Sequence, residues 1–192
     1  IPKGSAQKKI RDILGDTSIH TVCEEALCPN RGECFEKHTV TFLILGNTCT
    51  RNCDFCSIKA GDPGLVDTAE PFNVATAVQK LNLEHVVLTS VTRDDLPDGG
   101  AEQFAQAIEA IRDKVPGATI EVLVPDFQGN TSAIDTVLAA FPHVFNHNVE
   151  TVPRLYPTIR PQADLQQSLD VLRYAKNHSK CLIKSGFMVG LG

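Results

Sequence analysis

The sequence predicts an α/β protein built on a parallel β-sheet, and three observations lead to that prediction. Five short apolar runs, several of them rich in β-branched residues, recur along the chain and are expected to be strands. Amphipathic helical patterns separate these runs, with apolar residues three or four positions apart. Because single helices between strands require a parallel sheet wound in one sense, the five repeats indicate a barrel or an open α/β sheet.

The predicted elements run in order from residue 41 to residue 189. The strands are expected at 41–45, 85–91, 119–124, 144–149 and 182–189. The helices between them are predicted from four sets of apolar residues, namely Val74/Val78/Leu81, Phe104/Ile108/Ile111, Ile134/Val137/Leu138/Phe141 and Leu165/Leu169/Leu172. Asp164 is a suitable N-cap for the last helix, because its short side chain can accept a backbone N–H.

The first 40 residues have a different character. A basic helical pattern at 5–14, with Ser5 as its N-cap, predicts a peripheral arm. Residues 21–34 contain Pro29 and Gly32, which break regular structure, and few apolar residues, so a loop packed around a bound ligand is expected. The chain is therefore divided into an N-terminal arm at 1–40 and a main α/β unit at 41–192.

Composition limits the classes of function. The 192 residues carry a formal net charge of −5, and the 18 Lys and Arg are scattered, which argues against nucleic acid and membranes as partners. With 42% hydrophobic residues and no long uncharged apolar run, a soluble protein of the cytoplasm is expected. No signal-peptide pattern opens the chain, but it begins at Ile1 without a Met, so an organellar location after removal of a transit peptide stays open.

The seven cysteines are distributed in a way that indicates metal binding. Six of them fall into two groups of three: an N-terminal triplet of Cys23, Cys28 and Cys34, and a motif triplet of Cys49, Cys53 and Cys56. Groups of three cannot be paired off as disulfides, and a chain of this size does not need disulfides for stability, so a reducing compartment is expected. Cys181 begins an apolar strand and is interpreted as a buried, inert thiol.

The motif triplet has CxxxCxxC spacing and follows the first predicted strand and Gly46, so one tight loop is expected to bring its thiols together. Thiolates are the ligands that iron–sulfur clusters prefer, and a four-iron cluster held by three cysteines leaves one iron open for a non-protein ligand. Structural zinc or buried free thiols are the alternatives. Zinc is the stronger alternative for the N-terminal triplet, because His20 or His38 could complete a Cys3His site.

Polar residues follow the other predicted strands, at 89–100, 125–127 and 146–150. In parallel α/β folds the carboxyl ends of the strands carry the chemistry, so these segments are expected to meet at one mouth. The fifth strand contains Gly186 and Gly190, which would let a flat ligand approach the backbone closely.

The motif triplet, with Phe55 before its last cysteine and on the first loop of a βα series, resembles the signature of the radical S-adenosylmethionine (SAM) superfamily. The N-terminal triplet has CxxxxCxxxxxC spacing. Together with the strings at 89–96, 147–151 and 184–192, it is similar to the lipoyl synthase family within that superfamily. The match extends from about Thr21 to Gly192.

This resemblance implies a partial TIM-type (β/α)6 barrel with an N-terminal cluster-binding arm. The motif triplet would hold a [4Fe–4S] cluster that binds SAM and cleaves it to methionine and a 5′-deoxyadenosyl radical. The N-terminal triplet would hold an auxiliary [4Fe–4S] cluster that is consumed as the sulfur donor. The implied reaction is that of a sulfurtransferase of lipoate biosynthesis, which inserts two sulfur atoms at C6 and C8 of a protein-bound octanoyl chain.

The resemblance also implies a SAM site. Asn148 and Glu150 would bind the ribose hydroxyls, since a carboxylate accepts two hydroxyl donors well. The strand at 186–190, with Gly186 and Met188, would lie on the adenine side. Two further assignments concern the methionine part of SAM, with Gly99 and Gly100 beside its amino group and Arg160 beside its carboxylate.

Structural interpretations of the same residues stay open. Glu150 could be a solvated strand-end acid, Arg160 a surface cation, and Gly99-Gly100 a turn before a helix that begins at Ala101. His147 could be a structural histidine or could face the substrate. A separate group, for which no role is assigned, comprises Arg93, Asp94 and Asp95, which would line the active site or, for the two acids, cap local backbone.

In the lipoyl synthase family the chain continues past the last glycine to a further strand and a C-terminal Arg-Ser-Ser-Tyr segment, whose serine ligates the auxiliary cluster. This sequence stops at Gly192, so a fragment without the C-terminal barrel strand is expected, and Leu165 stands where an aromatic residue is expected. The implied partners are an octanoylated lipoyl carrier domain (an E2 subunit or a glycine-cleavage H protein), an electron donor such as ferredoxin or flavodoxin, and an iron–sulfur assembly carrier. The competing functions are another substrate, as in the biotin-forming relatives, and a non-catalytic iron–sulfur or zinc protein.

Overall fold

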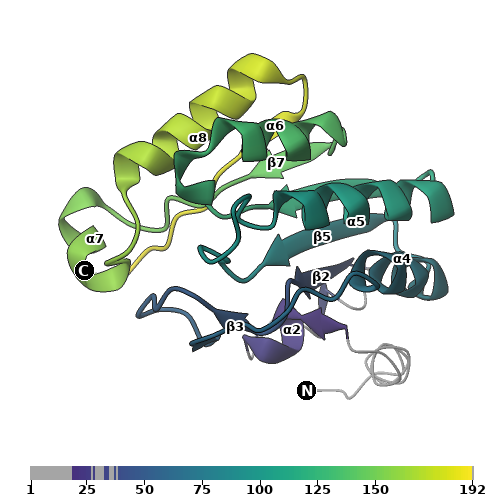
Figure 1. Cartoon of the computed structure of the whole chain (residues 1–192), viewed down its shortest axis with the longest axis horizontal. Coiled ribbons are helices and arrows are strands. Elements are labelled where there is room, and N and C mark those ends of the chain that lie inside the picture. The colour runs from purple at the N-terminus through teal and green to yellow at the C-terminus, as the bar shows by residue number, and fades with distance from the viewer. Residues whose placement is uncertain (1–18, 27, 29–32, 35–36, 38, 192) are drawn as a thin grey trace.

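The computed structural model describes residues 19–26, 28, 33–34, 37 and 39–191 (Figure 1). The expected helix at 5–14, together with Pro29, Gly32, His38 and Gly192, lies outside the described residues. The central feature is a six-stranded sheet with the strand order β1-β2-β5-β6-β7-β8. Its strands are His20–Thr21, Thr39–Ile44, His85–Ser90, Thr119–Leu123, Val144–Asn146 and Leu182–Lys184.

The sheet has the predicted parallel character. From β2 to β8 each neighbouring pair of strands is parallel, whereas β1 runs antiparallel to β2. The described strands form an open sheet, so the α/β class and the partial barrel are confirmed. The last two strands are shorter than expected, because β7 ends at Asn146 and β8 at Lys184, and beyond them Glu150 and Phe187 form an isolated bridge.

Four helices cover one face of the sheet (Figure 1), and they are α4 (Glu70–Leu81), α5 (Ala101–Lys114), α6 (Thr131–Ala139) and α8 (Leu165–His178). The core lies between them, where Phe42 and Leu88 of the sheet and Phe104 and Ile108 of α5 are fully buried. Among the described residues, no helix has both the length and the apolar character that crossing a bilayer requires.

The expected apolar face of α8 is wrong. Asp164 caps the helix as predicted, with its carboxylate accepting the Gln167 N–H at 2.8 Å. The face turned to the sheet, however, carries Ser168, Val171 and Ala175, while the three leucines are only half-buried. Small side chains let the helix approach the sheet closely, and this close approach outweighs the hydrophobicity of the leucines.

The last residue of the apolar set predicted for α6 is also misplaced. Phe141 follows the end of that helix with a φ of +54°, and its side chain is 76% exposed. The left-handed backbone at this position turns the chain toward β7, so the aromatic ring points away from the core.

The loop expected at 21–34 contains regular structure at its start. His20 and Thr21 form β1, and α2 (Val22–Glu25) follows at once. Thr21 caps this short helix by accepting the Glu24 N–H at 3.3 Å. Because β1 pairs with β2, this part of the N-terminal arm is an edge of the main sheet.

Candidate functional site

The motif triplet lies in the loop that follows β2. Cys49 ends β3 (Thr48–Cys49), and the other two cysteines lie between β3 and its partner strand β4 (Lys59–Ala60). Cys49 and Cys53 are half-buried, and Cys56 is exposed. One loop at the carboxyl end of the first long strand therefore carries all three thiols.

The three thiols lie close enough to affect one another's ionisation. Burial raises the pKa of Cys53; the Arg160 guanidinium opposes this effect, and the charges of Cys56 and Cys49 add to it. Burial is also the main cause of the raised pKa of Cys56, to which the charge of Cys49 again contributes. A bound metal centre would relieve this repulsion between thiolates.

Two backbone N–H groups donate hydrogen bonds to the sulfur of Cys49. It accepts the backbone N–H of Thr92 at 3.2 Å and that of Arg51 at 3.4 Å. Hydrogen bonds of this kind stabilise thiolates and tune the reduction potential of iron–sulfur clusters. Since Thr92 follows β5, this hydrogen bond ties the cysteine loop to the end of the strand that neighbours β2.

Two buried charged side chains fix the chain just before and just after the cysteine loop. The two oxygens of the Glu70 carboxylate accept the Leu45 N–H at 2.9 and 3.1 Å. The pKa of Glu70 is raised, because the effect of burial outweighs the lowering effect of this hydrogen bond. Arg93, only 2% exposed, donates to the Gly64 carbonyl at 2.8 Å and pairs with Asp95 at 2.8 Å. The segment between Leu45 and Gly64 is thus anchored at both ends.

Arg51, between the first two cysteines of the motif, makes a third buried anchor. Its guanidinium donates to both carboxylate oxygens of Asp94 and to both of Asp126. Burial alone would lower the pKa of Arg51, but the two carboxylates raise it. Burial alone would likewise raise the pKa of each carboxyl group, yet Arg51 holds both below their usual range.

The N-terminal triplet is also gathered beside β2. Cys23 lies in α2, and burial raises the pKa of its thiol. A hydrogen bond with the Thr41 backbone opposes this shift, and the charges of Cys28 and Cys34 add to it. The three cysteines therefore lie near one another and near the middle of β2.

His20 stays a possible zinc ligand through its Nε2, because a metal-binding histidine commonly donates its other ring N–H to a carboxylate. The Nδ1 of His20 lies 2.8 Å from the Glu25 carboxylate, and His38 is outside the described residues. In the part of the chain that the structure describes, no three His, Cys, Asp or Glu side chains converge tightly enough to hold a single metal ion.

Five of the residues expected to bind SAM meet beyond β7. The Asn148 side chain lies near enough to the Glu150 carboxylate to oppose the rise in its pKa, and Nη1 of Arg160 donates to the Asn148 carbonyl at 3.1 Å. The N–H of Met188 donates to the Glu150 carbonyl at 2.8 Å. A Cβ on Gly186 would overlap the Asn148 carboxamide, so only glycine leaves that amide in place.

Arg160 connects this group to the motif triplet, because its guanidinium lies near enough to Cys53 to oppose the rise in the pKa of that thiol. It also lies over the Tyr156 ring, 5.5 Å from the ring centroid. Its Nε is buried and has no hydrogen-bond partner among the described residues. A buried donor without an acceptor favours an anionic ligand at this point, and Arg160 is not a solvated surface cation.

The segment around Arg160 also holds the second half of the cysteine loop. The Asp54 N–H donates at 3.0 Å to the carbonyl of Ile159, the last residue of α7 (Tyr156–Ile159). The Asn52 N–H donates to the Gln162 side chain at 2.8 Å. Residues 52–54 are therefore docked on the chain that follows β7.

The Gly99-Gly100 pair lies in a tight turn before α5. The two glycines have φ values of +60° and +87°, and the Asp98 carboxylate accepts the Gly100 N–H at 2.9 Å. A Cβ on Gly99 would lie 2.9 Å from the Phe127 ring, and one on Gly100 would overlap Leu45. The turn interpretation accounts for both glycines, and Leu45 places them next to the cysteine loop.

His147 and Cys181 lie among protein groups, and the Nε2 of His147 is buried with no hydrogen-bond partner among the described residues. His147 is 2% exposed, its Nδ1 lies 2.8 Å from the Val124 carbonyl, and burial lowers its pKa. Cys181 is half-buried rather than buried, with its sulfur 2.9 Å from the Ser179 hydroxyl.

Sequence reasoning placed Asp126 at the mouth without a role and missed the other residues that hold the site together, namely Arg51, Glu70, Tyr156 and Gln162. A charged residue inside the cysteine motif and an acid directly after a strand are the signals that point to Arg51 and Asp126. Glu70 and Gln162 hold the site through backbone N–H groups, which every residue except proline carries and which therefore leave no trace in the sequence.

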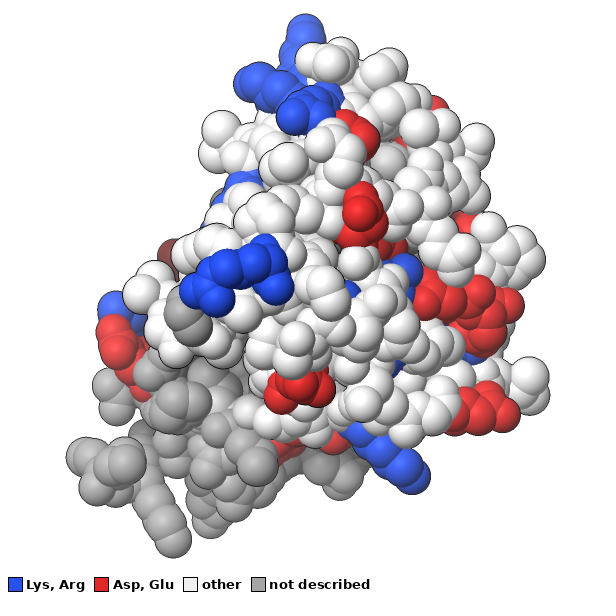
Figure 2. All heavy atoms as spheres, turned by 90° about the vertical axis from the view of Figure 1, so that its left-hand side faces the viewer, with Lys and Arg blue, Asp and Glu red and all other residues white. Residues whose placement is uncertain are grey.

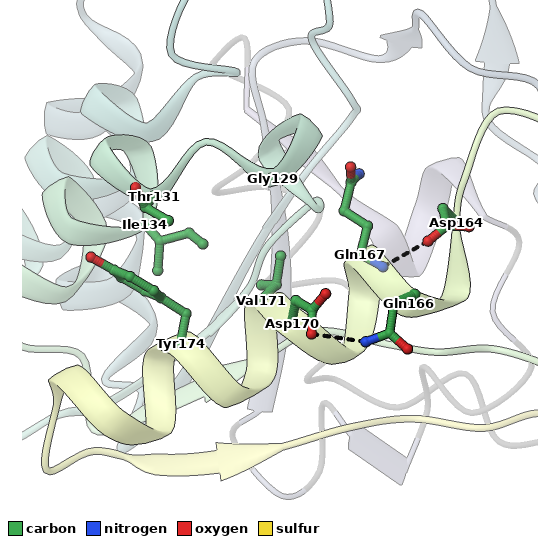
Figure 3. Close-up of a pocket in the computed structure, with 9 residues that line it drawn as sticks. All are labelled: Gly129, Thr131, Ile134, Asp164, Gln166, Gln167, Asp170, Val171 and Tyr174. Carbon is green, nitrogen blue, oxygen red and sulfur yellow. Dashed lines mark hydrogen bonds between the residues drawn. The ribbon is translucent and has the colours of Figure 1, made fainter.

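Two pockets lie near the carboxyl ends of the strands. The larger, about 390 Å³, lies outside the sheet between α6 and α8, and Figure 3 shows that side chains such as Tyr174, Gln167 and Ile134 line it. It contains no cysteine. The second, about 370 Å³, is lined by Asp94, Phe127 and Gln128 among others and therefore adjoins the Arg51 anchor.

The face on which β3 and α7 lie carries charges of both signs. Figure 2 shows small separate groups of acidic and basic side chains between larger uncharged areas in the coloured part of this face.

Comparison with known proteins identifies relatives. A family model described as the radical SAM superfamily matches residues 43–192. A lipoyl synthase of Rubrobacter xylanophilus is 57% identical over all of this chain, which covers 60% of that relative. A lipoyl synthase of Caldicellulosiruptor saccharolyticus is 55% identical, again over the whole chain, with 68% of the relative covered. The chain thus spans about three fifths to two thirds of the length of these relatives.

A solved structure supports the fold. The crystal structure of a methylornithine synthase aligns with 97% of this chain and 50% of its own, with a TM-score of 0.59 and 14% identity. At this level of identity the similarity concerns the fold alone.

Proposed function

Since the chain belongs to the radical SAM superfamily and, within it, to the lipoyl synthase family, we propose that it inserts two sulfur atoms into a protein-bound octanoyl chain, at C6 and C8. The observation that carries this proposal is the position of the two cysteine triplets, one beside β2 and one just beyond its carboxyl end. SAM and iron–sulfur clusters are the cofactors of this family, and the number and placement of the clusters are part of the proposal.

The motif triplet fits a cluster that binds SAM. Three thiols leave one iron of a [4Fe–4S] cluster open, backbone N–H groups already donate to Cys49, and the Arg160 guanidinium lies near Cys53. When bound, the cluster supplies the electron that cleaves SAM and so provides a carbon radical. The protein's own part is to hold the three sulfurs and to keep Arg160 beside them.

The N-terminal triplet fits the auxiliary cluster that gives up its sulfur. In this proposal residues 1–40 supply its three cysteines, and residues 41–192 form the radical SAM unit. Thr41, whose backbone is hydrogen-bonded to Cys23, precedes Leu45 by about 13 Å along β2, at about 3.3 Å per residue. The acyl chain is proposed to lie between the two triplets, on the side of β2 toward which both are gathered.

The group beyond β7 fits SAM itself. The unpartnered Nε of Arg160 suits the methionine carboxylate, because a guanidinium binds carboxylates through two parallel N–H groups. Glu150 and Asn148 suit the ribose hydroxyls, while Gly186 and Met188 lie on the adenine side. Burial raises the pKa of Glu150, so a hydroxyl ligand that donates to its carboxylate would stabilise the charged form. The Gly99-Gly100 turn is proposed to face the methionine amino group.

The partners follow from the reaction. The octanoyl chain would be presented on a lysine of a carrier domain, such as an E2 subunit or a glycine-cleavage H protein. Reduction of the cluster calls for a ferredoxin or flavodoxin, and replacement of the consumed cluster calls for an iron–sulfur carrier.

The test is anaerobic incubation of the complete, reconstituted protein with SAM, dithionite and an octanoyl-lysine peptide, followed by mass spectrometry. The expected product has gained two sulfurs and lost two hydrogens, and 5′-deoxyadenosine appears only with reductant. A protein that binds zinc and produces no deoxyadenosine would refute the proposal. SAM cleavage without sulfur insertion, by a protein that holds both clusters, would point to a different substrate.

A further inference from the structure

The contacts of Arg51 indicate a role in shaping the cysteine loop. Its Nε and Nη2 donate to the two oxygens of Asp94 at 2.6 and 2.8 Å. Its Nη1 and Nη2 donate to the two oxygens of Asp126 at 2.7 and 2.8 Å. One guanidinium, 7% exposed, is thus shared between two carboxylates, and the side chain of Asp126 is fully buried.

The two carboxylates come from different strands. Asp94 follows β5 and lies 43 residues from Arg51 in the sequence. Asp126 follows β6 and lies 75 residues from Arg51. The neighbouring Thr50 donates its N–H and its hydroxyl to the Thr92 carbonyl at 3.0 and 2.9 Å. Thr50 and Arg51 both attach the loop to residues that follow β5. Among the hydrogen bonds that these two residues make with described residues, only those of Arg51 to Asp126 also attach the loop to the end of β6.

Stability alone does not account for this arrangement. Moving three charges out of water carries a large desolvation cost, and apolar side chains of similar size often give equal or greater stability. Buried ion pairs are best explained where they fix one geometry among several. The segment 50–58, between β3 and β4, contains no helix or strand, so its shape depends on side-chain contacts such as these.

We propose that Arg51 is a positioning residue that holds Cys49 and Cys53 in their cluster-binding arrangement before iron arrives. This inference rests on the proposed role of the motif triplet as cluster ligands. A loop that is already ordered loses less conformational entropy when it binds, so the cluster is held more tightly and released more slowly. The forked guanidinium is essential to this role, because the single ammonium of a lysine cannot engage two carboxylates in a bidentate way.

The first test uses Arg51→Lys, which keeps the positive charge and removes the fork. Its matched control is Arg112→Lys, since the Arg112 guanidinium donates to the carbonyls of Ala140 and Phe141 at 2.7 Å, away from the cysteines. Both substitutions are made in the complete protein with the N-terminal triplet replaced by serine, so that bound iron reports on the motif triplet alone. Iron release to a chelator and the spectrum of the reduced cluster in electron paramagnetic resonance are measured under argon.

The expected result is that Arg51→Lys releases iron about tenfold faster and broadens the spectrum, whereas Arg112→Lys matches its parent. Equal release rates and identical spectra for Arg51→Lys and its parent would overturn the inference. A parent that takes up no iron would count against the proposed function. Hydrogen exchange in the metal-free protein would then decide the role of Arg51.

The second measurement is hydrogen exchange in the metal-free protein. The N–H groups of Thr50 and Asp54 donate to Thr92 and Ile159, so their exchange reports on the order of the loop. Arg51→Lys should speed exchange at 50–54 and leave the core strands unchanged; unchanged exchange at 50–54 would refute the role. Should Arg51→Lys fail to fold, a triple variant with Arg51→Met, Asp94→Asn and Asp126→Asn removes the ion pairs of Arg51 without leaving unpaired charges. It should show the same fast exchange at 50–54.

Discussion

The carboxamide of Asn148 occupies the space that a side chain on Gly186 would need. The backbone of Gly186 does not have a positive φ, so alanine is compatible with its conformation and would act only through this overlap. The Asn148 side chain in turn lies beside the Glu150 carboxylate, so a change at Gly186 is expected to reach the proposed ribose site.

Gly186→Ala should therefore weaken SAM binding by about tenfold, since a forced displacement of this size costs about 1–3 kcal/mol. Binding is measured by equilibrium dialysis with the reconstituted protein. Gly117→Ala is the control, because a Cβ at Gly117 meets nothing within 4 Å. Equal SAM affinity of the two variants would show that Asn148 does not contribute to the site.

The proposed division of labour between the cysteines predicts two different losses. Cys53→Ala should abolish SAM cleavage, while Cys28→Ala in the complete protein should keep some cleavage and eliminate sulfur insertion. The measurements are 5′-deoxyadenosine by chromatography and peptide product by mass spectrometry, with Cys181→Ala as a control expected to retain both. Equal loss of deoxyadenosine in the Cys53 and Cys28 variants, with folding intact, would contradict the division.

Arg160 is expected to bind through the geometry of its guanidinium as well as through its charge. Its Nη1 is engaged by the Asn148 carbonyl, and its Nε is the unpartnered donor. Arg160→Lys keeps the charge but removes Nε, so SAM affinity should fall about tenfold or more. The exposed Arg154 serves as the control through Arg154→Lys. Unchanged affinity of the reconstituted Arg160→Lys protein, measured by dialysis, would exclude Arg160 from the SAM site.

Acid unfolding should reveal the ion pairs of Asp126. Its folded pKa lies below the ordinary value of 3.8, so the stability it contributes is fully present above about pH 4 and is lost as pH falls through the lower, folded pKa. Asp126→Asn should lower the free energy of unfolding by about 1–3 kcal/mol at pH 7. Urea unfolding of the metal-free proteins from pH 7 to pH 2 should show this difference narrowing below pH 4. A difference that stays constant across the range would argue against a charged Asp126 in the folded state.

The strands were predictable from sequence because their signal is local. In the run from Val86 to Leu88 both end residues are fully buried, and the alternation with amphipathic helices leaves few other ways to pair such strands. The face of α8 was not predictable in this way. Ser168 and Ala175 face the sheet because they are small, and hydrophobicity alone would have chosen the leucines.

The candidate site was likewise predictable only in part from the sequence. The cysteine spacing and the resemblance it carries led to both triplets, and the strand-end rule led to Asn148 and Glu150. The pairing of Arg51 with Asp126 spans 75 residues, and several acids of the same sheet edge were equally suitable partners in the sequence. The strand β1 was missed for a related reason, since two residues carry no periodicity and their pairing with β2 is a long-range event.

The antiparallel pairing of β1 with β2 gives the N-terminal triplet a support that does not depend on iron. His20 pairs with Leu43 and Thr21 with Phe42, and Cys23 follows two residues later in α2. In the proposed function the donor cluster is dismantled during each reaction, and its loss would leave this main-chain attachment intact. A protein that has lost this cluster is thus expected to bind a replacement without refolding and to catalyse further turnovers.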